Sequence, residues 1–248
     1  MTHFTKASAL RAPVIAAALA CAAMAAQATT QTFATASTNP AASATFVTGA
    51  NSIGITLTNT LATPIVSAGQ ELTGLNFDVL GLPSISGSVN FTSGDLISIQ
   101  GGVLVDLADT TAAGAAAWNL SFTGGHMLLT ALAGSVGHNG PDDGIIPFAT
   151  SYPSANPSLT GSTHNPLFRG PVTFTLTGVA NVTAHSYIDD DSVVFRFNTD
   201  GATTRTGYCT SRDCEPPVPS VPEPETYALM LAGLGIMAFL ARRRSSND

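Results

Sequence analysis

The sequence predicts an all-β protein, an antiparallel β-sandwich of jelly-roll type, flanked by an N-terminal signal helix and a C-terminal transmembrane helix. Three observations lead to this fold class. The central part of the chain alternates apolar and polar residues with a period of two, the pattern of antiparallel strands that bury one face. Turn-forming residues recur between these short stretches, as they do in sandwiches. Continuous apolar stretches near both chain ends predict the two helices.

The N-terminal segment, residues 1–28, has the three parts of a secretory signal peptide. Two cations precede an apolar stretch at 14–26, and small residues follow at Ala26 and Ala28. This order of basic, apolar and small-x-small segments directs export and ends in a cleavage site. We therefore expect an exported protein whose mature chain starts near Thr29.

The mature part of the chain is acidic and contains no lysine. Between residues 29 and 223 four arginines stand against fourteen Asp and Glu residues, a net charge of −10, whereas the whole chain carries −7. Such a surface repels nucleic acid and anionic lipid, so a DNA- or RNA-binding function is excluded. About 195 residues are enough for one sizeable core, and we expect one domain at 29–214.

Nine stretches of the mature chain are candidate strands. In chain order they are 53–58, 75–79, 85–91, 96–100, 103–107, 118–122, 127–132, 172–177 and 193–197. In the last of them Val193, Phe195 and Phe197 share one face and Arg196 lies on the other. Turns are expected at 93–95, 101–102, 124–125 and 200–201. An alanine-rich stretch at 110–117 predicts a short helix.

A long segment at 134–171 interrupts the strand pattern. It is rich in Gly, Pro, Asn, Ser and His and shows little alternation. Long loops in compact domains are usually functional or mobile, so this loop is the natural place for a binding surface.

The cysteines fit an oxidising compartment. Cys209 and Cys214 lie five residues apart just before a Pro-rich linker, and a disulfide between them would staple the end of the domain. Cys21 follows Ala-Leu-Ala inside the signal peptide. We expect it to be lost with that peptide, and the alternative is a lipoprotein acylated at Cys21.

No nucleophile-elbow, zinc-protease or phosphate-loop motif is present, so we expect a protein that is not an enzyme and has no cofactor. A secreted hydrolase using two carboxylates or a Ser-His pair remains an alternative. Acidic residues cluster at Asp142 and Asp143 and at Asp189, Asp190 and Asp191. Solvated loop charges explain both clusters, and Ca²⁺ is the one metal that they could hold.

Threonine rows are the remaining surface feature. The pattern Thr-x-Thr-x-Thr occurs at 56–60 and again at 173–177. Such rows occur on ice-binding β-proteins, and their hydroxyls could instead meet polysaccharide or carry O-linked glycans. Threonine is also a good strand former, which explains both rows without any ligand.

The C-terminal tail joins an apolar helix to a basic cluster. Residues 226–241 carry no charge, and Arg242, Arg243 and Arg244 follow directly. An apolar helix with a cationic end predicts a membrane segment whose basic end stays in the cytoplasm. At about 1.5 Å per residue it spans about 24 Å, less than the roughly 30 Å hydrocarbon core, so it is a marginal anchor.

Pro222, Glu223 and Pro224 stand at the start of this tail, after a Pro-rich linker at 215–225. The order of Pro-Glu-Pro, short apolar helix and arginine cluster over 221–244 resembles the PEP-CTERM sorting signal of exopolysaccharide-producing Gram-negative bacteria. The resemblance implies an exosortase as partner, a membrane-embedded cysteine transpeptidase that recognises the tripeptide and cuts near it. An ordinary tail anchor is the alternative.

Together these features predict a non-enzymatic exported protein with a structural role in an exopolysaccharide matrix or biofilm. The tail would anchor it transiently in the inner membrane before it reaches the cell surface or the medium. Its expected partners are the exosortase, the membrane during sorting and exopolysaccharide. A carbohydrate- or ice-binding module is the alternative function.

Overall fold

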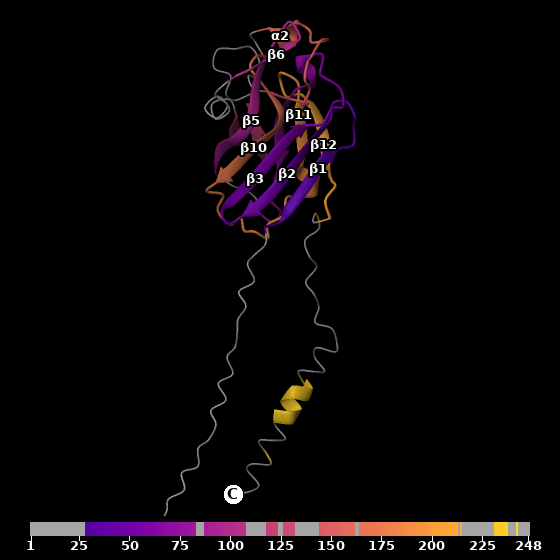
Figure 1. Ribbon diagram of the computed structural model, residues 1–248. Helices are drawn as coiled ribbons and strands as arrows, with labels where there is room; N and C mark the ends of the chain where they lie inside the picture. The colour runs from indigo at the N-terminus through magenta and orange to yellow at the C-terminus, as the bar shows by residue number, and fades with distance from the viewer. Residues whose placement is uncertain are drawn as a thin grey trace, which may run out of the picture.

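The computed structural model describes residues 28–82, 87–107, 118–123, 126–131, 144–161, 164–212, 214, 231–237 and 242. The signal segment before residue 28, the predicted helix at 110–117 and the first part of the long loop lie outside these ranges. The described part of the central domain is almost entirely strands and turns (Figure 1). The prediction of an all-β protein is confirmed.

Twelve strands are present in the described residues. They are β1 (Thr30–Thr35), β2 (Ala42–Gly49), β3 (Ser52–Asn59), β4 (Leu72–Phe77), β5 (Ser88–Gln100), β6 (Val103–Asp106), β7 (Asn119–Thr123), β8 (His126–Thr130), β9 (Ile145–Ile146), β10 (Leu167–Thr177), β11 (Val194–Phe197) and β12 (Thr203–Cys209). Every candidate strand from the sequence falls on one of them. Four strands were not predicted: β1, β2, β9 and β12.

Eight of the strands form a closed barrel rather than two separate sheets. Their order around the barrel is β10-β3-β2-β1-β12-β11-β4-β9, and β9 pairs with both β4 and β10. Ile145 of β9 lies opposite Leu72 of β4 in an antiparallel pair and opposite Phe168 of β10 in a parallel pair. The predicted antiparallel sandwich therefore needs correction, because a two-residue strand joins its faces and makes the sheet mixed.

The interior of the barrel is filled by the apolar half of each alternating strand. The buried side chains include Phe33 of β1, Phe46 of β2, Ile55 of β3 and Phe174 of β10. Phe46 packs against Phe33 with ring centroids 5.7 Å apart, in an edge-on geometry that aromatic pairs favour. Alternation thus turns the apolar residues inward and leaves the threonines outside.

The sheet extends beyond the barrel on two sides. β5 and β6 add to β10, and β8 and β7 add to β4. The turn predicted at 93–95 is wrong, because β5 continues through these residues and its register with β10 shifts there. A Cβ atom at Gly94 would come within 2.8 Å of both Phe91 and Phe168. This glycine therefore marks a bulge where the strand packs closely against aromatic rings.

The described part of the long loop is folded, contrary to the predicted lack of structure over 134–171. It contains β9, the four-residue helix α2 (Pro157–Thr160) and the first residues of β10. A second, smaller core lies beneath it, where Ile97 and Ile99 of β5 pack with Tyr152 and Leu159. Burial of these apolar side chains fixes the loop against β5.

The strand register defines two ends of the barrel, which we call the exit end and the far end. Thr177, the last residue of β10, pairs with Ser52, the first residue of β3. The first residues of β1 pair with the last residues of β2, which lie next to the start of β3. Thr30 and Thr177 therefore lie at the same end of the barrel, the exit end. The other end of β10 carries Leu167, β9 and α2. Eleven strand residues at about 3.3 Å each separate the two ends by about 36 Å. Figure 1 shows α2, at the far end, at the top, and the exit end, where the described chain of the domain begins and ends, at the bottom.

Two short 3₁₀ helices complete the described elements: η1 (Ala68–Gln70), which precedes β4, and η3 (Asp190–Ser192), which precedes β11. The side chain of Asp189 accepts a hydrogen bond from the backbone N–H of Asp191 at 3.2 Å and so caps η3. A cap of this kind satisfies a backbone donor at the start of the turn.

Candidate functional site

The two chain ends of the domain leave the exit end side by side. The N–H and the hydroxyl of Thr210 both donate to the carbonyl of Thr32, at 2.8 and 3.1 Å. Gln31 is fully buried, and its side-chain oxygen accepts from the N–H of Ile188 at 2.6 Å. Its amide nitrogen donates to the carbonyl of Cys214 at 3.5 Å. The start of β1 is thereby joined to the residues that lead into the tail.

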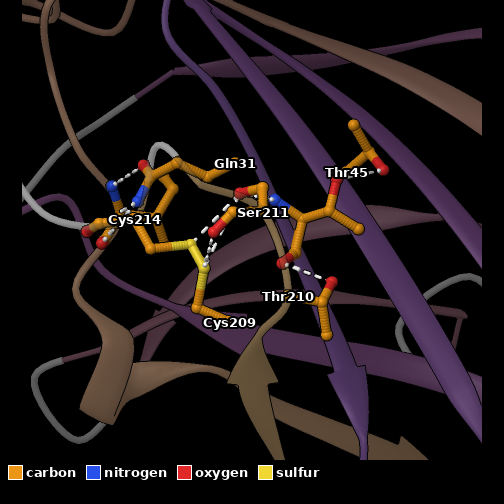
Figure 2. Close-up of a disulfide and its surroundings, with 8 residues drawn as sticks. Gln31, Thr45, Cys209, Thr210, Ser211 and Cys214 are labelled. Atoms are coloured by element: carbon orange, nitrogen blue, oxygen red, sulfur yellow. Dashed lines mark hydrogen bonds between the residues drawn. A yellow bond between two sulfur atoms is a disulfide. The ribbon is translucent and has the colours of Figure 1, made fainter.

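Cys209 and Cys214 form a disulfide at this point, as the sequence predicts (Figure 2). Their Cα atoms are 6.1 Å apart, and Cys214 is buried. Ser211 lies inside the closed loop and accepts a hydrogen bond from the N–H of Thr32 at 3.0 Å. The disulfide therefore fixes the last described residues of the domain to the first strand.

The predicted sorting segment is described only in part. Residues 231–237 are helical, and their side chains, including Leu234 and Met237, are exposed. Arg242 is described, whereas Pro222, Glu223 and Pro224 lie outside the described residues, as do Arg243 and Arg244. In the ranges that the structure describes, no helix is both long and apolar enough to cross a membrane.

The threonine rows of the sequence become a two-dimensional array on the outside of the barrel. Thr32, Thr45, Thr56 and Thr173 lie directly opposite one another on four successive strands, β1, β2, β3 and β10. The hydroxyls of Thr32 and Thr45 are 3.1 Å apart, and those of Thr56 and Thr173 are 3.3 Å apart. A third pair, Thr92 and Thr175, continues the array onto β5, with its hydroxyls 3.2 Å apart.

We call this surface the threonine face. It comprises sixteen outward residues on five adjacent strands: Thr30, Thr32, Ala34, Ser43, Thr45, Val47, Ser52, Gly54, Thr56, Thr58, Ser88, Asn90, Thr92, Thr173, Thr175 and Thr177. Toward the far end, outside this set, β10 and β5 carry the ion pair of Arg169 and Asp95. Nine of these sixteen residues are threonine and none is charged. Protein surfaces usually intersperse charges of both signs, so an uncharged face of this width is unusual on an acidic protein.

A hollow of about 370 Å³ lies at the far end, between β5 and the folded part of the loop. Among the described residues its lining is uncharged and comprises Ser98, Gln100, Leu107, Thr160, Asn165 and Pro166. Asn165 is held rigidly, because its side chain accepts from the N–H of Ile99 at 2.9 Å and donates to the carbonyls of Leu159 and Gly161. Three of these residues, Thr160, Asn165 and Pro166, belong to the loop in which the sequence predicts a binding surface.

A smaller hollow of about 160 Å³ lies near the exit end and includes His126, Asp191, Ser192 and Arg196 in its lining. The Nδ1 atom of His126 is hydrogen-bonded to the carboxylate of Asp78. The hydroxyl of Ser192 donates to the carbonyl of Asp189 at 2.6 Å and accepts from the N–H of Asp78. Its proton is therefore held by a backbone carbonyl and not by an imidazole, unlike the proton of an activated serine.

The acidic cluster Asp189, Asp190 and Asp191 belongs to the turn that contains η3. Within the described ranges, no three His, Cys, Asp or Glu side chains converge as a metal site would require. Asp142 and Asp143, the other weak calcium candidates, lie outside the described residues, and so does Ala26 of the predicted cleavage site. Ala28, its other member, is exposed where the described chain begins.

One buried carboxyl was not foreseen from the sequence. Glu71 is fully buried before β4, and neither of its side-chain oxygens has a hydrogen-bond partner among the described residues. Burial raises the pKa of this carboxyl well above its usual range. Its Oε2 lies only 2.7 Å from where a Cβ of Gly144 would be, so a larger residue there would force the Glu71 side chain to shift. Gly144 immediately precedes β9, and Glu71 thus lies beneath the strand that closes the barrel.

Sequence reasoning also missed Gln31 and the part of the threonine face that lies on β1 and β2. Gln31 sits in a Thr-Gln-Thr stretch with one following aromatic residue, which gives no sign that its side chain is buried. Thr32 and Thr45 belong to strands that were not predicted, so their alignment with Thr56 depended on a register that no sequence pattern shows.

Comparison with protein-family models matches residues 220–244 to the PEP-CTERM protein-sorting motif. The match covers the tripeptide, the apolar stretch and the arginine cluster, so the predicted resemblance is confirmed. No curated protein and no solved structure matches the chain. The chain therefore carries a PEP-CTERM motif at its C-terminus, which implies an exported, cell-surface protein that an exosortase sorts.

Proposed function

We propose that this protein is a non-enzymatic structural component of an exopolysaccharide matrix or biofilm. The C-terminal sorting motif is the observation that carries the proposal, because it directs the chain to the cell surface. The acidic, lysine-free barrel would be the part that acts there. Residues 1–28 would direct export, and the tail would hold the chain in the inner membrane until the exosortase cuts near Pro-Glu-Pro.

The geometry of the exit end supports this role. The last described residues before the tail are bonded to the start of β1, and the disulfide closes around that junction. A pulling force on the tail would therefore act first on these hydrogen bonds and the disulfide, and it would not separate β12 from its neighbouring strands. The far end, about 36 Å away along β10, would face away from the membrane while the tail is anchored.

The hydrogen bonds of the smaller hollow support a non-enzymatic role. Ser192 is bonded to backbone groups, and His126 is bonded to Asp78 at its Nδ1 atom. This arrangement lacks the serine–imidazole bond that activates a nucleophile.

Substitution of the tripeptide tests the sorting step. In cells that express the cognate exosortase, the Pro222→Ala, Glu223→Ala, Pro224→Ala variant should remain in the membrane fraction with its tail attached. Wild-type protein should lose the tail and reach the surface or medium. Pro216→Ala with Pro219→Ala, in the same linker but outside the tripeptide, is the matched control and should behave as wild type. Equal processing of the tripeptide variant, or wild-type protein that stays unprocessed in the cytoplasm, would contradict the proposal.

A second candidate function is a carbohydrate-binding module at the far end. The observation in its favour is the 370 Å³ hollow, which falls within the range of about 300–1,000 Å³ that is usual for small-molecule sites. Titration with neutral mono- and oligosaccharides, followed by NMR, should shift resonances of Ser98 and Gln100. Ser98→Ala should weaken binding, whereas Thr204→Ala on β12, outside both this hollow and the threonine face, should not. No shift at millimolar sugar would remove this candidate. Ice binding, the other form of this alternative, would instead require the threonine face.

A further inference from the structure

We propose that the threonine face binds an extended, uncharged polysaccharide chain lying across β1, β2, β3 and β10. This inference deepens the proposed function, on which it rests, by naming the surface and the chemical class of the partner. It follows from three properties of the face: a regular array of hydroxyls, the absence of charge, and the scarcity of large apolar side chains.

The hydroxyl array is regular in two directions. Neighbouring strands place Thr32, Thr45, Thr56 and Thr173 in one transverse row, with a repeat of about 4.8 Å from strand to strand. Along each strand the outward residues repeat every second position, about 6.6 Å apart. Each hydroxyl is both a donor and an acceptor, so a pair that shares one hydrogen bond keeps further capacity for a ligand. A polymer with repeating hydroxyls could therefore meet this row at successive points.

Charge selects the class of polymer. The mature chain carries −10, so an anionic polysaccharide is repelled by the protein as a whole. A cationic polymer would be drawn to carboxylates, and the sixteen residues of the threonine face include none. An uncharged polymer is the one partner whose electrostatics match the face itself.

The apolar content of the face argues against a protein partner, including a second copy of this chain. Val47, 42% exposed, is the one large aliphatic side chain among its sixteen residues, and the face has no aromatic residue. Stable protein interfaces depend on buried aromatic and aliphatic anchors at their centre. Hydroxyl-to-hydroxyl contacts are individually weak, but they add up when one long chain makes many of them at once.

The test is cosedimentation of the exported protein, isolated from the cells that export it, with two insoluble carbohydrate gels. One is a neutral glucan gel and the other is alginate, an anionic polymer that calcium crosslinks into a gel. We expect binding to the neutral gel and none to alginate. Thr45→Val with Thr56→Val removes two central hydroxyls but keeps the shape and the strand preference, and should weaken binding about tenfold or more. Thr204→Val with Thr206→Val makes the same change on β12, outside the face, and should leave binding unchanged.

Several results would overturn the inference. They are equal or stronger binding to alginate, unchanged binding by the Thr45→Val, Thr56→Val variant, and equal loss in the β12 control. If the wild-type protein forms concentration-dependent dimers and this variant does not, the threonine face binds a second copy of the chain instead. Thermal hysteresis that the variant abolishes, without glucan binding, would assign it to ice. All of these outcomes are measured on protein that has already been exported, so none of them contradicts the sorting proposal. A failure of sorting would instead be detected by cell fractionation.

Discussion

Glu71 offers the sharpest physical test of the fold, because it is a buried carboxyl with no partner. Both of its side-chain oxygens are unpartnered, and it lies against Gly144 beneath the closing strand β9. The charged form of such a group is costly in a low-dielectric interior, so the folded protein holds it protonated. Glu71→Gln keeps the size of the side chain and removes its titration. The prediction concerns how the stability difference between the two proteins changes with pH.

The sign of this pH dependence follows from the number of protons that the folded and the unfolded states bind. In the unfolded chain Glu71 titrates near its ordinary pKa of 4.5, whereas burial raises its pKa well above that in the folded protein. Between these two pKa values the folded state binds the proton and the unfolded state does not, so wild-type stability falls as pH rises. The slope approaches about 1.4 kcal/mol per pH unit for one proton. Below pH 4.5 the group adds no pH-dependent difference, and above its folded pKa the difference is constant.

Urea unfolding at closely spaced pH values between 4 and 8 measures this difference. The free energy of unfolding of Glu71→Gln minus that of wild type should grow by about 1.4 kcal/mol per pH unit once the pH exceeds 4.5. Asp191→Asn, which removes an exposed carboxyl on η3, is the control for the loss of one negative charge. A difference between Glu71→Gln and wild type that does not change with pH would refute the assignment of a protonated, desolvated Glu71.

Three further predictions concern the barrel core, the disulfide and the tail. Phe46→Ala should lower the free energy of unfolding by about 3–5 kcal/mol through a cavity in the barrel, whereas Val47→Ala on the outer face should cost far less; chemical denaturation of both variants checks this. Replacing Cys209 and Cys214 by serine should cost about 2 kcal/mol, the value for a loop of this size, and equal thermal stability of variant and wild type would contradict it. Changing residues 242–244 to serine should remove the charge that orients the tail, and protease protection of membrane vesicles would then report mixed or inverted orientation.

Period-two alternation was enough to predict four of the eight barrel strands and the four strands that extend the sheet beyond it. Leu57 and Phe174 alternate with threonines in long strands, and the structure buries both. β12 was missed because its sequence, Thr-Thr-Arg-Thr-Gly-Tyr-Cys, has little apolar alternation, and Gly207 stands at its buried inward position. β9 has only two residues, too few for any period, yet it closes the barrel. Its position depends on long-range pairing that a local pattern cannot contain.

The candidate sites also differ in how far the sequence could predict them. The disulfide was predictable because Cys209 and Cys214 are the two cysteines outside the predicted signal peptide, and an oxidising compartment pairs such cysteines. The threonine face was predictable only strand by strand, since Thr56 and Thr173 are 117 residues apart and meet through register. Glu71 gave no signal, because a single glutamate before a strand is normally exposed.

The account depends most on the claim that both apolar ends are sorting signals and the acidic barrel is the exported part. Intact mass spectrometry of the protein isolated from the surface or medium of its own host tests this most directly. We expect one species that begins near Thr29, ends near the Pro-Glu-Pro tripeptide and retains the Cys209–Cys214 disulfide. A mass that matches all 248 residues, recovered from the cytoplasm, would contradict the account.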